Sequence, residues 1–442
     1  MKLIFTVLIL IFLQNCSFDN KTGIWKNEHS ISKKEDNDIF KEFKTIAVTN
    51  KVFNETSPID NKFVFKLTNP INNLSWGDIF YSQGNNKKNF LYKNLNKLNF
   101  KTKKITKHKN SYFLLFEENN IITNDSAGNI NIFAINQNKF VTKFNFYKKK
   151  YKKVKKILNL IVEDNIIYVS DNIGYIYAFN YKINKIIWAK NYKIPFRSNL
   201  KISNNKLIAV NQNNNLFFLN KKNGEILTSI PTEKTIIKNE FVNNLSLNEK
   251  YVFFLNTYGS LYGIDLNNMR INWFINLNQS LELNPSSLFK GNQVVNNSNL
   301  VVVNSNQFTN IIDSRNGNII YKKNFTSTIK PLIINNYLFS ITNNDLLISM
   351  DLANGEIIYS LDINNEIAEF LDIKKQKVKI KNLMMLNNEI FVFLKNSYLV
   401  KFNTRGKLQD VSQLPVKINT HPILINGSLL YLDAKNKLCI ID

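Results

Sequence analysis

Few side chains in this sequence carry the chemistry of an active site or a metal centre. The chain includes two cysteines, Cys16 and Cys439, and three histidines, His29, His108 and His421. Two cysteines so far apart form neither a disulfide framework nor a thiolate zinc site, and the histidines are too scattered to suggest a metal cluster. This inventory favours a protein without catalytic chemistry.

Other catalytic patterns are missing as well. The sequence has no Gly-rich phosphate loop and no Gly-x-Ser-x-Gly elbow. The adjacent Glu117 and Glu118 would point to opposite faces of a strand, so they cannot easily act as a carboxylate pair. Asp265, Asp313 and Asp351 recur at the ends of similar strands, which indicates hydrogen bonds to turn amides rather than metal binding. We therefore expect no metal, no cofactor and no enzymatic activity.

The N-terminus has the pattern of an export signal. A positive charge at Lys2 is followed by an apolar run that ends at Leu13, too short to span a bilayer. With Leu13 three residues before Cys16, the segment resembles a bacterial lipoprotein signal, although Asn15 departs from the usual small residue. The resemblance implies that residues 1–15 are removed and that Cys16 carries acyl chains that anchor the protein to a membrane. Ser17 then favours the outer membrane.

The 442-residue chain is long enough for a sizeable core and strongly basic, with 44% hydrophobic residues and a formal charge of +25. Residues 16–62 are polar and charge-mixed, which predicts a flexible arm. The densest basic stretch, from Lys148 to Lys156, is predicted to be an exposed loop. It would suit anionic lipid headgroups or an acidic partner, or it merely keeps the loop solvated. Nucleic acid is not expected, because an exported protein rarely meets it.

The rest of the chain, residues 63–442, repeats one β-rich pattern. Runs of Ile, Val, Phe and Tyr alternate with polar turns. The Asn-Gly pairs at 223–224, 316–317 and 354–355 predict β-hairpins, because both turn residues can take a positive φ. Equivalent central-strand positions recur at intervals of roughly 37–51 residues, the length of a four-stranded propeller blade. Those positions are Ile132, Ile176, Phe217, Tyr262, Ile311, Ile348, Leu399 and Leu438. We predict an all-β, eight-bladed propeller.

The two ends of the repeat region also fit a ring. The last repeat stops at Asp442, directly after its third strand, and lacks a fourth. An unattached β segment from Leu98 to Thr102 precedes the first full repeat. We expect this segment to complete the last blade and close the ring, which removes an open edge.

The repeat resembles that of quinoprotein-type propellers, since each unit ends in Asp, a Gly and then Trp or Tyr. With Cys16 ahead of it, the chain resembles the BamB family, the propeller lipoproteins of the outer-membrane β-barrel assembly machinery. Ser75-Trp76 and the Gly/Asn-rich stretch from Gln83 to Asn86 resemble a segment of that family's alphaproteobacterial branch, as does the stretch from Ile194 to Ser198. The degenerate Trp positions are Leu227, Tyr321 and Tyr359.

The resemblance implies a non-enzymatic scaffold at the periplasmic face of the outer membrane. Its partners would be a BamA-like barrel-forming subunit, other members of the assembly complex and nascent outer-membrane proteins. By the same resemblance, loops around the middle blades would contact that subunit. The candidate contact residues are Thr232, Glu233, Lys234, Ser287, Leu288 and Phe289.

Two alternative functions remain open from the sequence. A quinoprotein-like, PQQ-dependent dehydrogenase would need a calcium site, and that family also uses adjacent cysteines, which this chain lacks. The second alternative is a propeller that binds a saccharide or an envelope polymer. His421 is expected to be an ordinary residue between blades.

Overall fold

The computed structural model describes residues 16–18, 25–27, 52–147, 151–234, 244–278, 293–305 and 307–442. Two compact units divide the chain, Met1–Lys51 and Val52–Asp442. In the first, β1 (Cys16–Phe18) pairs antiparallel with β2 (Trp25–Asn27), and Cys16 lies opposite Asn27. The second unit begins ahead of residue 63, because Phe53 and Ser57 already hydrogen-bond to Asn324 and Ser360.

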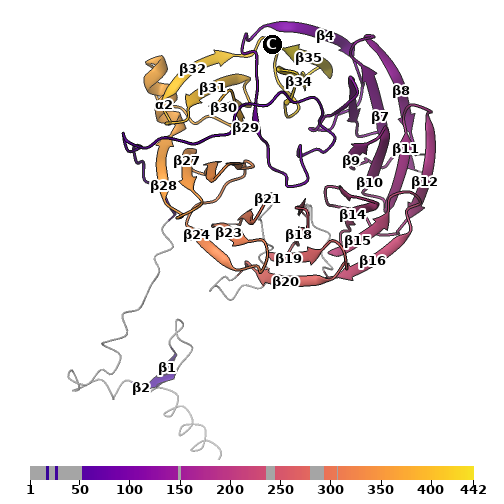
Figure 1. Ribbon diagram of the computed structural model, residues 1–442, viewed down its shortest axis with the longest axis horizontal. Coiled ribbons are helices and arrows are strands. Elements are labelled where there is room, and N and C mark those ends of the chain that lie inside the picture. The colour runs from indigo at the N-terminus through magenta and orange to yellow at the C-terminus, as the bar shows by residue number, and fades with distance from the viewer. Residues whose placement is uncertain are drawn as a thin grey trace, which may run out of the picture. The chain divides into compact units, whose positions relative to one another are not determined.

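The second unit is a ring of eight four-stranded antiparallel blades, as predicted (Figure 1). The innermost strands of blades one to eight are β5 (Leu115–Glu117), β9 (Leu158–Glu163), β13 (Lys201–Ser203), β17 (Asn244–Leu247), β21 (Gln293–Asn297), β25 (Leu332–Ile334), β29 (Ile380–Leu386) and β33 (Ile423–Ile425). The second strands are β6 (Asn120–Asn124), β10 (Ile166–Asp171), β14 (Lys206–Val210), β18 (Tyr251–Leu255), β22 (Leu300–Asn304), β26 (Tyr337–Ile341), β30 (Glu389–Leu394) and β34 (Ser428–Leu432).

The outer half of each blade is equally regular. The third strands are β7 (Asn129–Ala134), β11 (Tyr175–Asn180), β15 (Asn215–Asn220), β19 (Ser260–Asp265), β23 (Thr309–Asp313), β27 (Leu346–Asp351), β31 (Tyr398–Asn403) and β35 (Lys437–Ile441). The fourth strands, on the rim, are β8 (Lys139–Asn145), β12 (Lys185–Asn191), β16 (Ile226–Pro231), β20 (Ile271–Asn276), β24 (Ile319–Lys323), β28 (Ile357–Asp362), β32 (Leu408–Gln413) and β4 (Leu98–Lys104). All eight expected central positions lie in third strands.

The predicted closure of the ring is confirmed. Strand β4 pairs antiparallel with β35, with Phe100 opposite Ile440 and Lys101 opposite Cys439. The chain therefore supplies the last blade with a strand from before its first repeat, and the ring has no open end between blades.

Burial explains the residue pattern of the strands. The inner three strands pack between neighbouring blades on both faces, so they are largely buried and mostly apolar, as in β26 (Tyr337–Ile341), which is buried throughout. The rim strands have one face in solvent, so exposed and half-buried residues alternate, as in β8 (Lys139–Asn145). A short helix, α2 (Ile363–Leu371), lies between blades six and seven, and its N-cap is Asp362. The β-rich repeat did not predict it. Within the described residues, none of the helical structure is long and apolar enough to cross a membrane.

The Asn-Gly turns differ from the prediction in one respect. At 316–317, Gly317 has φ of +77°, but Asn316 does not have a positive φ. Instead the Asn316 side chain accepts a hydrogen bond from the amide of Asn318. The predicted hairpins are confirmed, as by the antiparallel pair β23 and β24. A positive φ at both turn residues was the wrong reason, because the asparagine side chain stabilises a different turn.

Each of these glycines lies under an aromatic ring from the preceding blade. Trp273 Nε1 of β20 donates to Ser314 O at 3.0 Å, and its ring covers Gly317. Tyr321 occupies the corresponding place in the next blade, where its hydroxyl donates to Ala353 O at 2.8 Å. Tyrosine therefore preserves the contact between blades at this degenerate Trp position.

Replacing Gly317 by alanine is expected to lower the free energy of unfolding by about 1–2 kcal/mol. The added Cβ would lie 2.5 Å from Trp273 Cε3, at a φ of +77° that L side chains rarely adopt. Denaturant unfolding followed by tryptophan fluorescence measures the change. The control is Asn318→Ala, at the next residue, which is exposed. Equal stability of the two variants would contradict the packing argument.

Candidate functional site

The six residues predicted to contact a partner fall partly inside the described chain. Thr232, Glu233 and Lys234 follow β16, at the junction between blades three and four. The rest of the predicted set lies outside the described residues, namely Ser287, Leu288 and Phe289.

Glu233 is engaged within the propeller. Its carboxylate accepts hydrogen bonds from Tyr262 Oη at 2.5 Å, Ser260 Oγ at 2.7 Å and Asn256 Nδ2 at 2.5 Å. Burial opposes ionisation of this carboxyl, but the hydrogen bonds outweigh burial and hold its pKa below the usual value. Glu233 therefore connects the end of blade three to blade four. Among the described residues of this loop, Lys234 is also exposed.

The predicted basic loop connects blades one and two, as expected, but its lysines are not equivalent. Residues 148–150 lie outside the described residues, and Lys152, Lys153 and Lys155 are exposed. Lys156 is 4% exposed and donates to Tyr151 O at 2.6 Å, with its ammonium 5.2 Å from the centre of the Tyr147 ring. The expectation of an exposed loop was wrong for Lys156, because hydrogen bonding and a cation–π contact hold it in the fold.

The recurring aspartates form turns, as predicted. Asp265 Oδ1 accepts from the amide of Asn267 at 2.8 Å, and Asp313 Oδ1 accepts from that of Arg315 at 2.8 Å. Across the described residues, no group of three or more His, Cys, Asp and Glu side chains is arranged to hold a metal ion.

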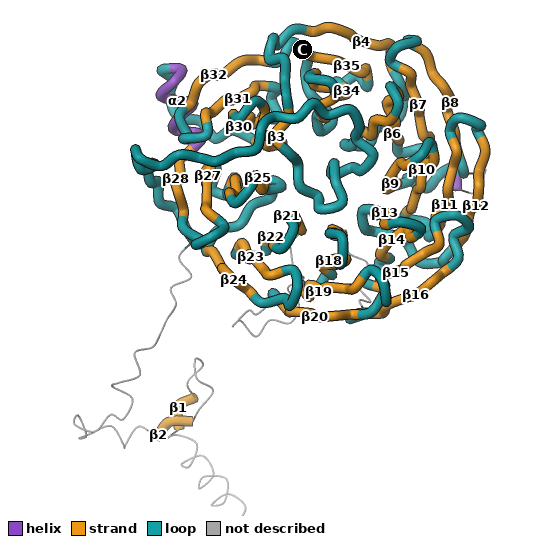
Figure 2. The backbone as a smooth tube through the Cα atoms, viewed as in Figure 1, coloured by secondary structure: helices purple, strands orange, loops and turns teal. Residues whose placement is uncertain are grey.

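One segment ahead of the first blade contacts every blade of the ring. This central segment (residues 73–90) runs inside the ring, in indigo in Figure 1 and mostly as teal loop in Figure 2. It ends in β3 (Asn89–Phe90), which pairs parallel with β29. Its contacts with blades one to eight, in that order, include Trp76 with Phe116, Gly77 with Val162, Gln83 with Ile202, Gln83 with Leu247, Gly84 with Asn296, Asn86 with Ile333, Asn89 with Met385 and Asn73 with Leu424.

The side chains of the central segment replace solvent as partners for the inner strands. Asn85 is 1% exposed, and its Nδ2 donates to both Leu245 O and Val294 O at 2.8 Å. One amide group thus satisfies carbonyls of two neighbouring blades. Inner edges of a propeller would otherwise present unpaired backbone groups to the channel.

A buried ion pair fixes the same segment to blade three. Lys201 of β13 is fully buried, and its Nζ lies 2.6 Å from Asp78 Oδ2 and 2.8 Å from Ser82 O. Burial lowers the pKa of Lys201, whereas the neighbouring Asp78 carboxylate acts to raise it. The pair is therefore a strong structural constraint at the axis of the ring.

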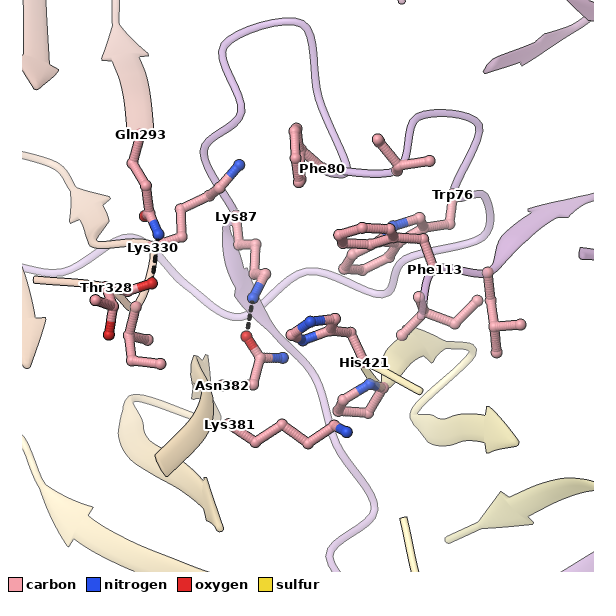
Figure 3. Close-up of a pocket in the computed structure, with 15 residues that line it drawn as sticks. Trp76, Phe80, Lys87, Phe113, Gln293, Thr328, Lys330, Lys381, Asn382 and His421 are labelled. Carbon is pink, nitrogen blue, oxygen red and sulfur yellow. Dashed lines mark hydrogen bonds between the residues drawn. The ribbon is translucent and has the colours of Figure 1, made fainter. Parts of the chain in front are cut away.

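The central segment also forms one wall of a cavity of about 160 Å³ (Figure 3). Lys87, Lys330 and Lys381 approach it from three different elements, and no carboxylate is among its lining residues. Lys87 Nζ donates to Asn382 Oδ1 at 2.6 Å and to Leu383 O at 3.1 Å. Burial lowers the pKa of Lys87 to about 7. Burial, followed by the charges of Lys201 and Lys87, lowers the pKa of Lys330 well below its usual value.

His421 lies in this cavity rather than in an ordinary contact between blades. Its ring stacks on Phe113 with centroids 5.2 Å apart. Burial and the charges of nearby lysines, Lys87 first among them, lower its pKa to about 3. The prediction for His421 did not foresee this cluster, since its lysines are far apart in a lysine-rich sequence.

The low pKa of His421 predicts a specific loss of stability in acid. The unfolded chain binds a proton at this histidine below pH 6.5, whereas the folded protein does so near pH 3. Stability is therefore expected to fall as pH drops through this window, by up to about 1.4 kcal/mol per pH unit. His421→Phe should remove that part of the slope in denaturant unfolding, and the variant His108→Phe, at an exposed position, should retain it. Parallel pH profiles for wild type and His421→Phe would contradict the prediction.

The fold and the site define a class. The protein is an eight-bladed propeller with quinoprotein-type repeats, whose axis is occupied by its own central segment. The sequence model described as outer membrane protein assembly factor BamB matches residues 128–361, just over half of the chain. The chain belongs to the BamB family.

Solved structures resemble the fold at low sequence identity. BamB from Moraxella catarrhalis superposes with a TM-score of 0.58 and 12% identity, covering 74% of this chain and 95% of that one. The quinohemoprotein alcohol dehydrogenase from Comamonas testosteroni superposes with a TM-score of 0.58 at 9% sequence identity, and the match covers 83% of this chain and 80% of that one. The computationally designed Ika8 protein has a TM-score of 0.58 at 10% identity, and the match covers 77% of this chain and 98% of that one. Comparison with curated protein sequences gives no match.

Proposed function

We propose that this protein is a non-enzymatic scaffold of outer-membrane β-barrel protein assembly, held by a lipid on Cys16 at the periplasmic face of the outer membrane. The observation that carries this proposal is the match of residues 128–361 to the BamB family. The N-terminal pattern of Leu13 and Cys16 supports the lipid anchor.

The mechanism would be physical rather than chemical. A ring whose blades are tied together by one central segment is rigid, so it can present its loops in a fixed geometry. The loop that contains Lys234 and the segment that contains Phe289 are the proposed contacts with a barrel-forming subunit. Among the described residues, the outer edges of the rim strands carry no further strand, apart from β28, whose Ser360 pairs with Ser57. The free rim strands are candidates for β-augmentation by unfolded barrel substrates.

Affinity purification of the tagged, full-length protein from gently solubilised membranes tests the proposal. A barrel-forming subunit with POTRA domains should co-purify and be identified by mass spectrometry. The protein recovered alone, with an absorbing quinone chromophore, would instead support the dehydrogenase alternative. Cys16→Ala should release the protein from the membrane fraction without changing the fold of the propeller.

The same experiment tests the contact loop. Lys234→Glu reverses the charge of an exposed side chain and should weaken co-purification. Lys185→Glu makes the same change on the exposed face of β12 and should leave it intact. Equal recovery with both variants would remove this loop from the proposed interface.

A further inference from the structure

The cavity beside His421 gathers three lysine side chains and unused hydrogen-bond donors. Lys330 Nζ lies 3.1 Å from the centre of the Phe80 ring and has no carboxylate or carbonyl acceptor among the described residues. Two further lining groups, Trp76 Nε1 and Asn382 Nδ2, are buried without an acceptor in the described part of the chain. Buried donors nearly always have partners, so donors gathered at one cavity indicate a missing acceptor.

The donors belong to well-buried side chains. Trp76 is 2% exposed and Asn382 is 5% exposed. In Figure 3, the amide nitrogen of Asn382 lies on the side that faces His421. Lys87 and Lys381 approach the same space from either side, although Lys87 Nζ already donates to Asn382 Oδ1 and Lys381 Nζ to Asn419 O. An anionic acceptor here would supply the missing hydrogen bonds and would favour the charged form of the lysines, whose pKa values burial lowers.

The remaining walls are apolar and set the size of an occupant. Phe80, Phe113 and Pro422 line the cavity together with several aliphatic side chains. A cavity of about 150 Å³ can hold a molecule of the size of benzene, and this one measures about 160 Å³. Gln293 Oε1, a buried acceptor without a donor among the described residues, adds a position for a ligand hydroxyl or N–H group.

We propose that this cavity binds the carboxylate of a small organic acid that has a compact apolar body. The carboxylate would lie among Lys87, Lys330 and Lys381, and the apolar body would contact Trp76, Phe80 and Phe113. The site is independent of the assembly role, because it lies at the axis of the ring and not in the loops proposed for partner contact.

The cavity adjoins a wider hollow. That hollow measures about 770 Å³ and is also lined by Phe80, Phe113 and Lys330, so the two spaces share these side chains as a boundary.

Thermal unfolding and calorimetry of the purified full chain test the site with three probes. Benzoate carries the carboxylate and the apolar body, benzamide has the body without the charge, and phosphate has the charge without the body. Millimolar benzoate is expected to raise the melting temperature through preferential binding to the folded state, and benzamide and phosphate are expected to have far smaller effects. No effect of benzoate, or an equal effect of benzamide or phosphate, would overturn the proposal.

Variants locate the binding. Lys330→Met keeps a long apolar side chain over Phe80 and should weaken benzoate binding at least about tenfold. Lys381→Met, on a different element, should weaken it too. Lys185→Met on the rim is the matched control and should bind as wild type does. Unchanged affinity in both cavity variants, with melting curves that show them folded, would overturn the assignment of the site.

Discussion

Replacement of Asp78 by alanine is expected to lower the free energy of unfolding by about 3–5 kcal/mol. The substitution leaves Lys201, which is fully buried, without its counter-ion. Taking a lone ammonium out of water is far more costly than losing one hydrogen bond, since Lys201 would keep only the Ser82 carbonyl as a partner. Urea or guanidinium unfolding measures the loss.

Two further variants isolate the cause. In Asp78→Ala combined with Lys201→Met, no buried charge is left, so most of the lost stability should return. Glu118→Ala breaks an ion pair of similar length, with Lys182 at 2.7 Å, but both side chains are more than half exposed. This control should cost less than about 1 kcal/mol. A double variant no more stable than Asp78→Ala would show that the aspartate acts in some other way.

The architecture could be predicted from the sequence because the signal is repeated eight times. Each blade carries the same third-strand position, such as Phe217 or Tyr262, and a chance pattern would not recur at so regular an interval. Closure by the segment from Leu98 could be predicted for a related reason. A last repeat without a fourth strand needs a β segment from elsewhere in the chain, and β4 supplies it.

The axis of the ring could not be predicted in the same way. Asn85 and Asn86 are two asparagines among many, and nothing local distinguishes them from the solvent-facing ones. Their roles come from contacts more than 150 residues away, such as that of Asn85 with Leu245. The Gly/Asn-rich stretch did stand out as a family resemblance, but its place in the channel depends on closure of the ring.

The three lysines of the cavity could not be predicted from the sequence, because the whole chain is rich in lysine. Lys87, Lys330 and Lys381 are spread over almost 300 residues in a chain with 58 Lys and Arg residues. A sequence analysis that discounts lysine as background cannot separate the buried ones. The usable signal is indirect: the neighbours of Lys87 at Gln83 and Asn86 belong to the stretch that the resemblance marks out.

The central segment turns eight separate blades into one cooperative unit. Propeller blades contact mainly their neighbours, so stability would otherwise be a sum of local terms. The central segment contacts the inner strand of every blade, so it links distant blades directly. For example, Trp76 contacts blade one and Asn86 contacts blade six. Damage at one point of the segment should therefore destabilise the whole ring.

Gly84→Val is expected to cause such damage and to lower the free energy of unfolding by more than about 3 kcal/mol. A Cβ at Gly84 would lie 2.7 Å from both the backbone oxygen and Oδ1 of Asn296. Asn296 cannot easily move, because its Nδ2 donates to Ser246 Oγ at 2.5 Å and to Leu247 O at 2.7 Å in the neighbouring blade. The segment must shift instead, and the two carbonyls that Asn85 satisfies lose their partner.

Unfolding and limited proteolysis of the same variant distinguish a central role from a local one. Gly84→Val should unfold at lower denaturant concentration and be cut within residues 73–90 while the rim strands are still protected. Lys88→Ala, at an exposed position of the same segment, should match the wild type in both measurements. If Gly84→Val lost stability without new cleavage in the segment, the clash would be absorbed by blade five alone. Any coupling between blades would then have to come from their lateral contacts, in which Trp188 and Trp273 take part, and not from the central segment.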